Sequence, residues 1–217
     1  MPVYTVARNE PAGTQLRWLT CEEVPVGYHT PGQCVLANPT NHEPSYFAIA
    51  SSPGEPLELL VKQQGKTALA LGATDPGDSI EVSEVIGDGF PIEDDQRTLV
   101  ALANGSGISA LRPVIRREIA RGLPRPVHLF YGVFTPDRRS FLADLEAWAN
   151  SGVQVQTVIA LPGGTGWTGA SGMVQDLAVA QGLVRPDTAV VAAGVPAMID
   201  AARELWEAVG APVHVNF

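Results

Sequence analysis

The sequence predicts two domains, an antiparallel β-barrel over residues 1–95 and an α/β domain with a parallel sheet over residues 96–217. Three observations support this prediction. Short β-type runs separated by turn residues fill the first half. In the second half, apolar strand-like runs alternate with helical patterns. The chain has 217 residues, of which 45% are hydrophobic, so it can build one large core or two small ones.

The barrel is predicted from six short strands. Residues 3–8 and 15–19 flank Glu10-Pro11-Ala12-Gly13, which has the composition of a hairpin turn. The other four runs each lie beside a turn rich in Pro, Gly or Ser. They cover residues 34–36, 46–50, 57–62 and 79–85. Short strands at this spacing are typical of a small barrel or sandwich.

The second domain is predicted from five strand-like runs and four helical patterns. The runs cover residues 99–103, 127–131, 153–161, 189–193 and 213–215. The helical patterns between them cover residues 108–121, 141–151, 172–181 and 197–209. Alternation of this kind indicates a parallel sheet with helices on its faces. We place the domain boundary near Asp95, in a charged stretch.

A glycine-rich turn, Asn104-Gly105-Ser106-Gly107, joins the first strand of this domain to its first helix. Glycines there let the backbone approach a pyrophosphate, and the helix N-terminus supplies N–H donors. The third glycine of the dinucleotide fingerprint is absent, so an ordinary strand-to-helix turn is the alternative. Two more small-residue turns, Tyr131-Gly132 and Ala193-Gly194-Val195-Pro196, follow later strands. Three such turns at one sheet edge favour a ligand crevice.

The order of these motifs resembles the ferredoxin–NADP reductase superfamily, whose members join a flavin-binding barrel to a nicotinamide-nucleotide-binding domain. Tyr46-Phe47-Ala48-Ile49-Ala50-Ser51 resembles its flavin motif, and Gly65-Lys66-Thr67-Ala68 resembles its flavin-phosphate loop. Gly105-Ser106-Gly107-Ile108-Ser109 resembles the loop that faces the nicotinamide nucleotide. The chain is most similar to a reductase-like subfamily that includes plant fruit proteins.

The resemblance implies FAD, with FMN as the alternative, and NADH or NADPH as the reductant. Phe47 is expected to flank the flavin ring, and Phe217 to cover it. No catalytic side chain and no metal site is implied, because hydride transfer is the chemistry of the cofactors. The implied cofactor-binding residues are Tyr46, Phe47, Ala48, Ile49, Ala50, Ser51, Val61, Lys62, Gly65, Lys66, Thr67, Ala68, Gly105, Ser106, Gly107, Ile108, Tyr131, Gly132, Gly194, Pro196, Met198 and Phe217.

Several positions depart from the family pattern. Ser45 stands where the family has an arginine that pairs with the flavin phosphate, and Ala48 replaces a hydroxyl residue. Ala68 replaces a Ser or Thr, and Ala193 replaces a cysteine. Two functions therefore stay open. One is a flavin-dependent oxidoreductase that passes hydride from NAD(P)H to flavin and electrons on to an acceptor; the other is a non-catalytic flavin- or nucleotide-binding member.

The choice between NADH and NADPH rests on a few side chains. The resemblance places the reader of the 2′-phosphate at Ala160-Leu161, and both residues are apolar, which favours NADH. Arg138 and Arg139 are the alternative readers, although solvated residues at a helix start explain them as well.

The net charge of −9 argues against partners such as duplex nucleic acid and anionic membrane. Residues 1–95 hold four Lys and Arg against fourteen Asp and Glu, whereas residues 96–217 hold ten against nine. An acidic barrel predicts a small molecule or a non-acidic protein as the electron acceptor. The two cysteines, Cys21 and Cys34, leave one disulfide open. No leader and no apolar run of about 20 residues is seen, so the cytoplasm is the expected location.

Overall fold

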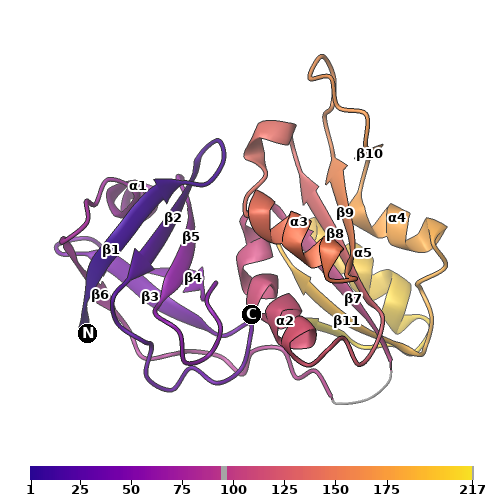
Figure 1. The fold of residues 1–217 in the computed structure, drawn as a ribbon, viewed down its shortest axis with the longest axis horizontal. Helices are drawn as coiled ribbons and strands as arrows, with labels where there is room; N and C mark the ends of the chain where they lie inside the picture. Colours follow the sequence, from indigo (N-terminus) through magenta and orange to yellow (C-terminus); the bar gives the residue numbers. More distant parts are fainter. Residues whose placement is uncertain (94–96, 217) are drawn as a thin grey trace.

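The first sheet of the computed structural model, which describes residues 1–93 and 97–216, is an antiparallel barrel (Figure 1). Its strands pair in the order β4-β3-β6-β1-β2-β5. A bridge between Ile49 and Leu59 links the two ends of this order and closes the barrel. The strands are β1 (Val3–Pro11), β2 (Leu16–Cys21), β3 (Cys34–Pro39), β4 (Ser45–Ala48), β5 (Glu58–Lys62) and β6 (Ser79–Val82).

A short helix, α1 (Lys66–Gly72), covers one end of the barrel and is absent from the sequence-based prediction. Seven residues make only two turns, too few for the helical period to be read from the sequence. Tertiary contacts hold the helix instead. Ala68 and Leu71 are buried in the barrel core, and the Thr67 hydroxyl donates to the Glu43 carbonyl over 2.6 Å.

The second sheet is parallel throughout and confirms the predicted α/β architecture. Its strands pair in the order β10-β9-β8-β7-β11-β12. The order reverses between β7 and β11, which is where open α/β sheets bind their ligands. The strands are β7 (Thr98–Asn104), β8 (Val127–Val133), β9 (Gln154–Ile159), β10 (Ala170–Ser171), β11 (Thr188–Ala193) and β12 (Val213–Val215).

Helices cover both faces of the parallel sheet. Helices α2 (Ile108–Ala120) and α3 (Leu142–Asn150) pack on one face, and α4 (Val174–Ala180) and α5 (Pro196–Glu207) on the other. An apolar core lies on each face of the sheet, and strand β7 contributes to both. Leu99, Ala101 and Ala103 face α2, whereas Val100 and Leu102 face α5. The 3-10 turns η1 (Gly105–Gly107) and η2 (Pro136–Arg138) follow β7 and β8.

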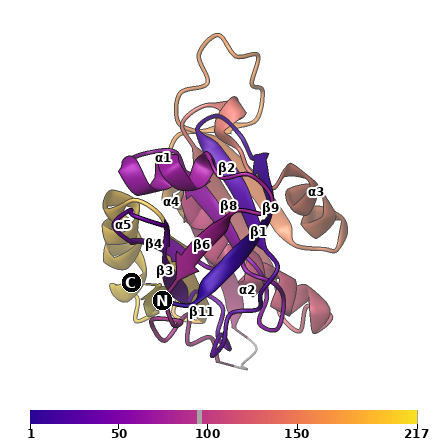
Figure 2. The ribbon, with the colours of Figure 1, turned by 90° about the vertical axis from the view of Figure 1, so that its left-hand side faces the viewer.

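The two domains lie side by side, and Figure 2 shows the barrel in front of the second domain, with α3 to its right and α5 to its left. The barrel residues Leu16, Ala50 and Leu60 belong to the same apolar cluster as α2. The predicted boundary near Asp95 falls in residues 94–96, outside the described residues. Within the described ranges, every helix is too short or too polar to cross a membrane.

Candidate functional site

A cleft of about 1050 Å³ separates the barrel from the carboxyl edge of the parallel sheet. The barrel contributes the turn between β1 and β2, strand β4, the end of β5 and the start of α1. The other wall comes from the turns that follow β7, β8 and β11. The residues that line it are Thr14, Gln15, Leu16, Ser45, Tyr46, Phe47, Ala48, Leu60, Lys62, Gln64, Gly65, Ala68, Asn104, Gly105, Ser106, Gly107, Ser109, Ala110, Val133, Phe134, Arg138, Ala193, Gly194, Val195, Pro196, Ile199 and Asn216.

Three glycines shape the wall at the point where the strand order reverses. A Cβ on Gly107 would overlap the carbonyl of Ala193, and one on Gly194 would lie 2.7 Å from Cβ of Asn104. Both glycines are therefore required by the close contact of the two turns. Gly105 differs, because it has a φ of 55° and open space where its Cβ would lie. Its backbone is the part of this turn that a ligand can approach.

The N-terminus of α2 lies at this wall and continues the turn η1, because backbone N–H groups at the Ile108 cap donate to the carbonyls of Gly105 and Ser106. Gly107 at the N-cap offers no side-chain cap, and the first turn carries no acidic residue. The Ser109 hydroxyl donates to the Ser106 carbonyl over 2.8 Å, so it does not occupy the amides. An uncapped helix N-terminus with this polarity is suited to hold an anionic group such as a phosphate.

Six of the barrel residues implied by the resemblance line the cleft, namely Tyr46, Phe47, Ala48, Lys62, Gly65 and Ala68. The rest do not. Ile49, Ala50, Ser51, Val61 and Thr67 are buried, and Lys66 is exposed outside the cleft. Tyr46 is the most exposed aromatic of this wall, at 62%, whereas Phe47 is partly buried against the barrel core.

On the opposite wall, five implied residues line the cleft, namely Gly105, Ser106, Gly107, Gly194 and Pro196. Ile108, Tyr131, Gly132 and Met198 lie behind them and are buried. The Tyr131 hydroxyl accepts a hydrogen bond from the Ser140 amide over 3.1 Å. Burial raises the pKa of this hydroxyl to about 12. Phe217 lies outside the described residues, and its neighbour Asn216 lines the cleft.

All four departures from the family pattern, Ser45, Ala48, Ala68 and Ala193, line the cleft. Among the described residues that line the cleft, the two charged side chains are both cations, Lys62 on the barrel and Arg138 in η2, and none is acidic. Arg139 instead lies over the ring of Trp167, at 5.2 Å from its centroid. The cleft thus presents positive charge within a chain of net charge −9.

The sequence did not indicate that the tip of the β1–β2 turn lines the cleft. The Thr14 amide donates to the Asp137 carbonyl over 2.8 Å, and the Ser140 hydroxyl donates to the Ala12 carbonyl over 2.6 Å. A Cβ on Gly13 would lie 2.7 Å from the Arg139 carbonyl. This turn therefore docks against η2 and joins the two walls at one side of the cleft. No local sequence signal marks such a docking contact.

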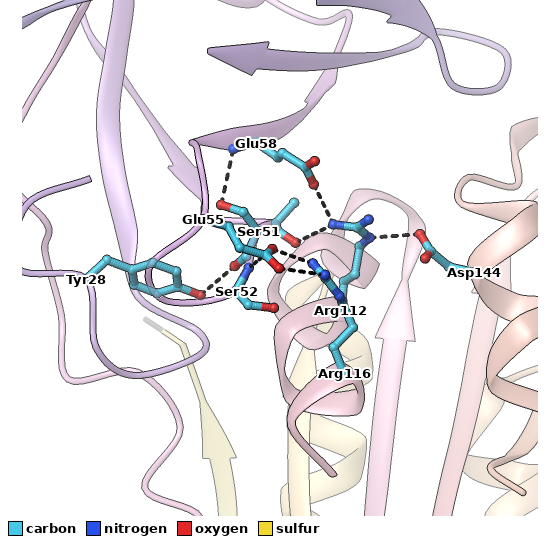
Figure 3. A network of polar contacts seen from close by, with 9 residues as sticks. Tyr28, Ser51, Ser52, Glu55, Glu58, Arg112, Arg116 and Asp144 are labelled. Atoms are coloured by element: carbon cyan, nitrogen blue, oxygen red, sulfur yellow. Dashed lines mark hydrogen bonds and ion pairs between the residues drawn. The ribbon is translucent and has the colours of Figure 1, made fainter. Parts of the chain in front are cut away.

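Arg112, on α2, joins the domains at a second place (Figure 3). Its guanidinium donates to Glu58 over 2.5 Å, to the Ala50 carbonyl over 2.9 Å and to Asp144 over 2.8 Å. It also lies over the rings of Trp18 and Phe141, with centroids at 5.2 and 4.9 Å. Ala50 lies two residues beyond the end of β4, so Arg112 fixes the segment that follows this strand against α2.

A neighbouring ion pair extends this contact toward the surface. Arg116 binds Glu55 through two hydrogen bonds of 2.6 and 2.7 Å (Figure 3). Burial alone would raise the pKa of Glu55, but the Arg116 guanidinium and the Ser52 amide hold it below its ordinary value. The Tyr28 hydroxyl donates to the Ser51 carbonyl over 2.9 Å and braces the same segment.

Comparisons with known proteins agree with this geometry. A family model described as "Oxidoreductase NAD-binding domain" matches residues 101–204. The chain is 30% identical over 201 residues to fruit protein pKIWI502 of Actinidia deliciosa, an alignment that covers 83% of this chain and 63% of that protein. It is 28% identical over 217 residues to an NAD(P)H-flavin reductase of Aliivibrio fischeri, covering 94% and 91% of the two chains.

Two solved structures share the fold. The ferredoxin reductase in carbazole 1,9a-dioxygenase superposes with a TM-score of 0.84 at 22% identity, over all of this chain and 70% of that one. A ferredoxin NADP+ reductase from Neisseria gonorrhoeae, solved with bound FAD and NADP, gives 0.81 at 17% identity over 100% and 98% of the two chains. The chain spans less than two thirds of the length of the fruit protein.

Proposed function

The chain belongs to the ferredoxin–NADP reductase-like superfamily, and from this premise we propose that it is an NAD(P)H-dependent oxidoreductase that uses a flavin in the cleft between its domains. The observation that carries the proposal is the cleft itself. It brings the implied flavin strand β4 and the implied nucleotide turn after β7 into one cavity. Hydride transfer requires this juxtaposition of two cofactor sites more than it requires acid–base side chains.

The lining residues fit the two cofactors that the superfamily implies. A cavity of about 1050 Å³ is slightly larger than the range of roughly 300–1,000 Å³ that is usual for small-molecule sites. It offers an aromatic side chain in Tyr46, two cations, and an uncapped helix N-terminus. Each of these features suits a planar ring system that carries phosphate groups.

In this proposal each wall holds one cofactor. The barrel wall binds the flavin, as FAD or FMN, through Tyr46, Lys62, Gly65 and neighbouring backbone. The opposite wall binds NADH or NADPH through the open backbone of Gly105 and the turn that contains Gly194. A bound flavin would supply the acceptor for the hydride of NAD(P)H, which carries two electrons and leaves NAD(P)⁺, and one proton from solvent would complete the reduction.

The chain's own residues supply positioning. Arg112 and the β1–β2 turn hold the two walls at a set distance, because each makes hydrogen bonds across the domain interface.

A small molecule or a non-acidic protein is the acceptor that we propose for the electrons of the reduced flavin. The excess of acid in residues 1–95 would slow the encounter with an acidic protein.

The test is flavin-dependent oxidation of NADH and of NADPH by the purified protein, with FAD and with FMN. The proposal expects the absorbance of the reduced nucleotide to fall much faster when protein and flavin are both present than when either of them is omitted. A protein that binds neither flavin, or that binds flavin without any nucleotide oxidation, would contradict the proposal.

A non-catalytic flavin- or nucleotide-binding member is the second candidate. It is favoured by one observation, namely that Ser45, Ala48, Ala68 and Ala193 all line the cleft and lack the groups that the superfamily carries there. The double variant Ser45→Arg, Ala48→Ser separates the candidates. It should create flavin binding or nucleotide oxidation where the natural chain has none if this second candidate holds.

A further inference from the structure

The wall of the cleft formed by β4 and β5 has two distinct faces. The bridge between Ile49 and Leu59 aligns the strands antiparallel, and both residues lie in the barrel core. Continued along the strands, that register sets Ala48 opposite Leu60 and Tyr46 opposite Lys62. Residues that face each other across such a pair point to the same side of the sheet. These four side chains therefore share the face that looks away from the barrel core.

Burial and packing agree with this assignment. Ala48 and Leu60 pack with the apolar cluster of the second domain, whereas Val61 and Phe47 pack with the barrel core. Tyr46 and Lys62 are exposed, and all four residues of the outer face line the cleft. The cleft wall thus has an apolar floor, Ala48 and Leu60, with an aromatic ring and an ammonium group at one end.

The ammonium group of Lys62 has no protein partner among the described residues. Its side chain makes neither a hydrogen bond nor an ion pair within residues 1–93 and 97–216. Within the part of the chain that the structure describes, no acidic residue lines the cleft, although residues 1–95 carry fourteen Asp and Glu. A lone cation at the end of an apolar floor is arranged to meet a ligand that has a flat apolar part and an anionic group.

We propose that Lys62 binds the phosphate of the flavin, with the ring system on the floor made by Ala48 and Leu60. This inference rests on the proposed function. Lys62 would supply, on the barrel wall, the positive charge that the superfamily's arginine supplies at the position of Ser45. The inference assigns no role to Lys66, which was also implied by the resemblance. Lys66 is exposed, does not line the cleft, and begins a helix of only seven residues.

Equilibrium binding of FMN and of riboflavin to the full-length protein tests the inference, because riboflavin is the same ring system without the phosphate. Flavin fluorescence gives both dissociation constants without any turnover. The natural chain should bind FMN at least about tenfold more tightly than riboflavin, as expected for one charge-assisted contact. Lys62→Gln should lose that preference and keep the affinity for riboflavin, whereas Lys62→Arg should retain the preference.

Lys66→Gln is the matched control, because it removes the same charge four residues away. It should leave the affinity ratio of FMN to riboflavin unchanged. Three outcomes would overturn the inference: equal binding of both flavins by the natural chain, loss of the preference in Lys66→Gln but not in Lys62→Gln, or an equal fall of both affinities in Lys62→Gln. Binding of neither flavin would instead refute the proposed function, so the two failures are distinguishable.

Discussion

Gly107 is glycine because of a contact between two backbone turns. A side chain there would overlap the carbonyl of Ala193, and neither backbone segment can move without shifting a buried strand. We expect Gly107→Ala to lower the free energy of unfolding by about 1–3 kcal/mol, the usual cost of overpacking. It should also weaken NADH binding, since the displaced turn belongs to the wall that we propose for the nucleotide. Urea unfolding and an NADH titration measure the two effects.

The control for this prediction is Gly163→Ala. Gly163 has open space around it and does not adopt a left-handed conformation. Its replacement should change the free energy of unfolding by less than about 0.5 kcal/mol. If Gly107→Ala were as harmless as Gly163→Ala, the contact between the turns would not be rigid, and the proposed reason for the glycine would be wrong.

Cys21 and Cys34 are free and buried in the barrel, so the disulfide that the sequence left open is not formed. Burial, with a smaller contribution from the charge of Glu23, raises the pKa of the Cys21 thiol to about 12. Burial also raises the pKa of Cys34. Because the thiolate is the reactive form, neither residue should react quickly with a disulfide reagent at about pH 8 in the folded protein.

Thiol titration checks this prediction. Two thiols should appear when the protein is unfolded in denaturant without a reducing agent, and almost none within minutes in the native state. Fewer than two thiols after unfolding would mean a disulfide, and fast native labelling would contradict the burial of both side chains.

At the scale of elements, α2 connects the turn after β7, which we propose for the nucleotide, to the barrel through Arg112. Removing the guanidinium in Arg112→Met would leave the Ala50 carbonyl without this donor and Glu58 and Asp144 without their shared cation. We expect a loss of about 2–4 kcal/mol in the free energy of unfolding. The neighbouring variant Arg116→Met should cost less than about 1 kcal/mol, because that ion pair is more exposed. Equal effects in urea unfolding would contradict this ranking.

The ion pair between Arg116 and Glu55 makes domain contact depend on pH. Because the pKa of Glu55 in the folded state lies below its ordinary value of about 4.3, the pair stabilises the protein above that pH. This contribution is lost as the pH falls through the folded-state pKa. The stability advantage of the natural chain over Glu55→Gln should therefore be largest near neutral pH and shrink toward about pH 3. An advantage that does not change with pH would contradict it.

The elements of the parallel sheet were predictable because their signals are local. Both faces of β7 and β11 are covered by helices, so these strands read as unbroken apolar runs. Helix α1 was not predictable, since its stability comes from packing on the barrel and from the bond between Thr67 and the Glu43 carbonyl. The faces of β4 were also beyond the sequence, because its register against β5 assigns Tyr46 and Phe47 to opposite sides.

At the scale of the whole molecule, the order of motifs in the sequence was enough to predict where the cleft lies. It was not enough to predict all the side chains that line the cleft and hold its walls together. The turns at Gly105 and Gly194 could be assigned to one sheet edge, because a switch in strand order brings them together. Arg112 and Thr14 could not be identified, because their contacts join segments far apart in the sequence. The arrangement of the two walls depends on such long-range contacts, which no local pattern encodes.

The central claim is that the two walls of the cleft bring a flavin and a reduced nicotinamide nucleotide together for hydride transfer. Anaerobic mixing of the flavin-loaded protein with NADH or NADPH tests it most directly, because no electron acceptor is needed. We predict that the visible absorbance of the oxidised flavin disappears, with one nucleotide oxidised per flavin. A bound flavin whose absorbance persists with both nucleotides would contradict the claim.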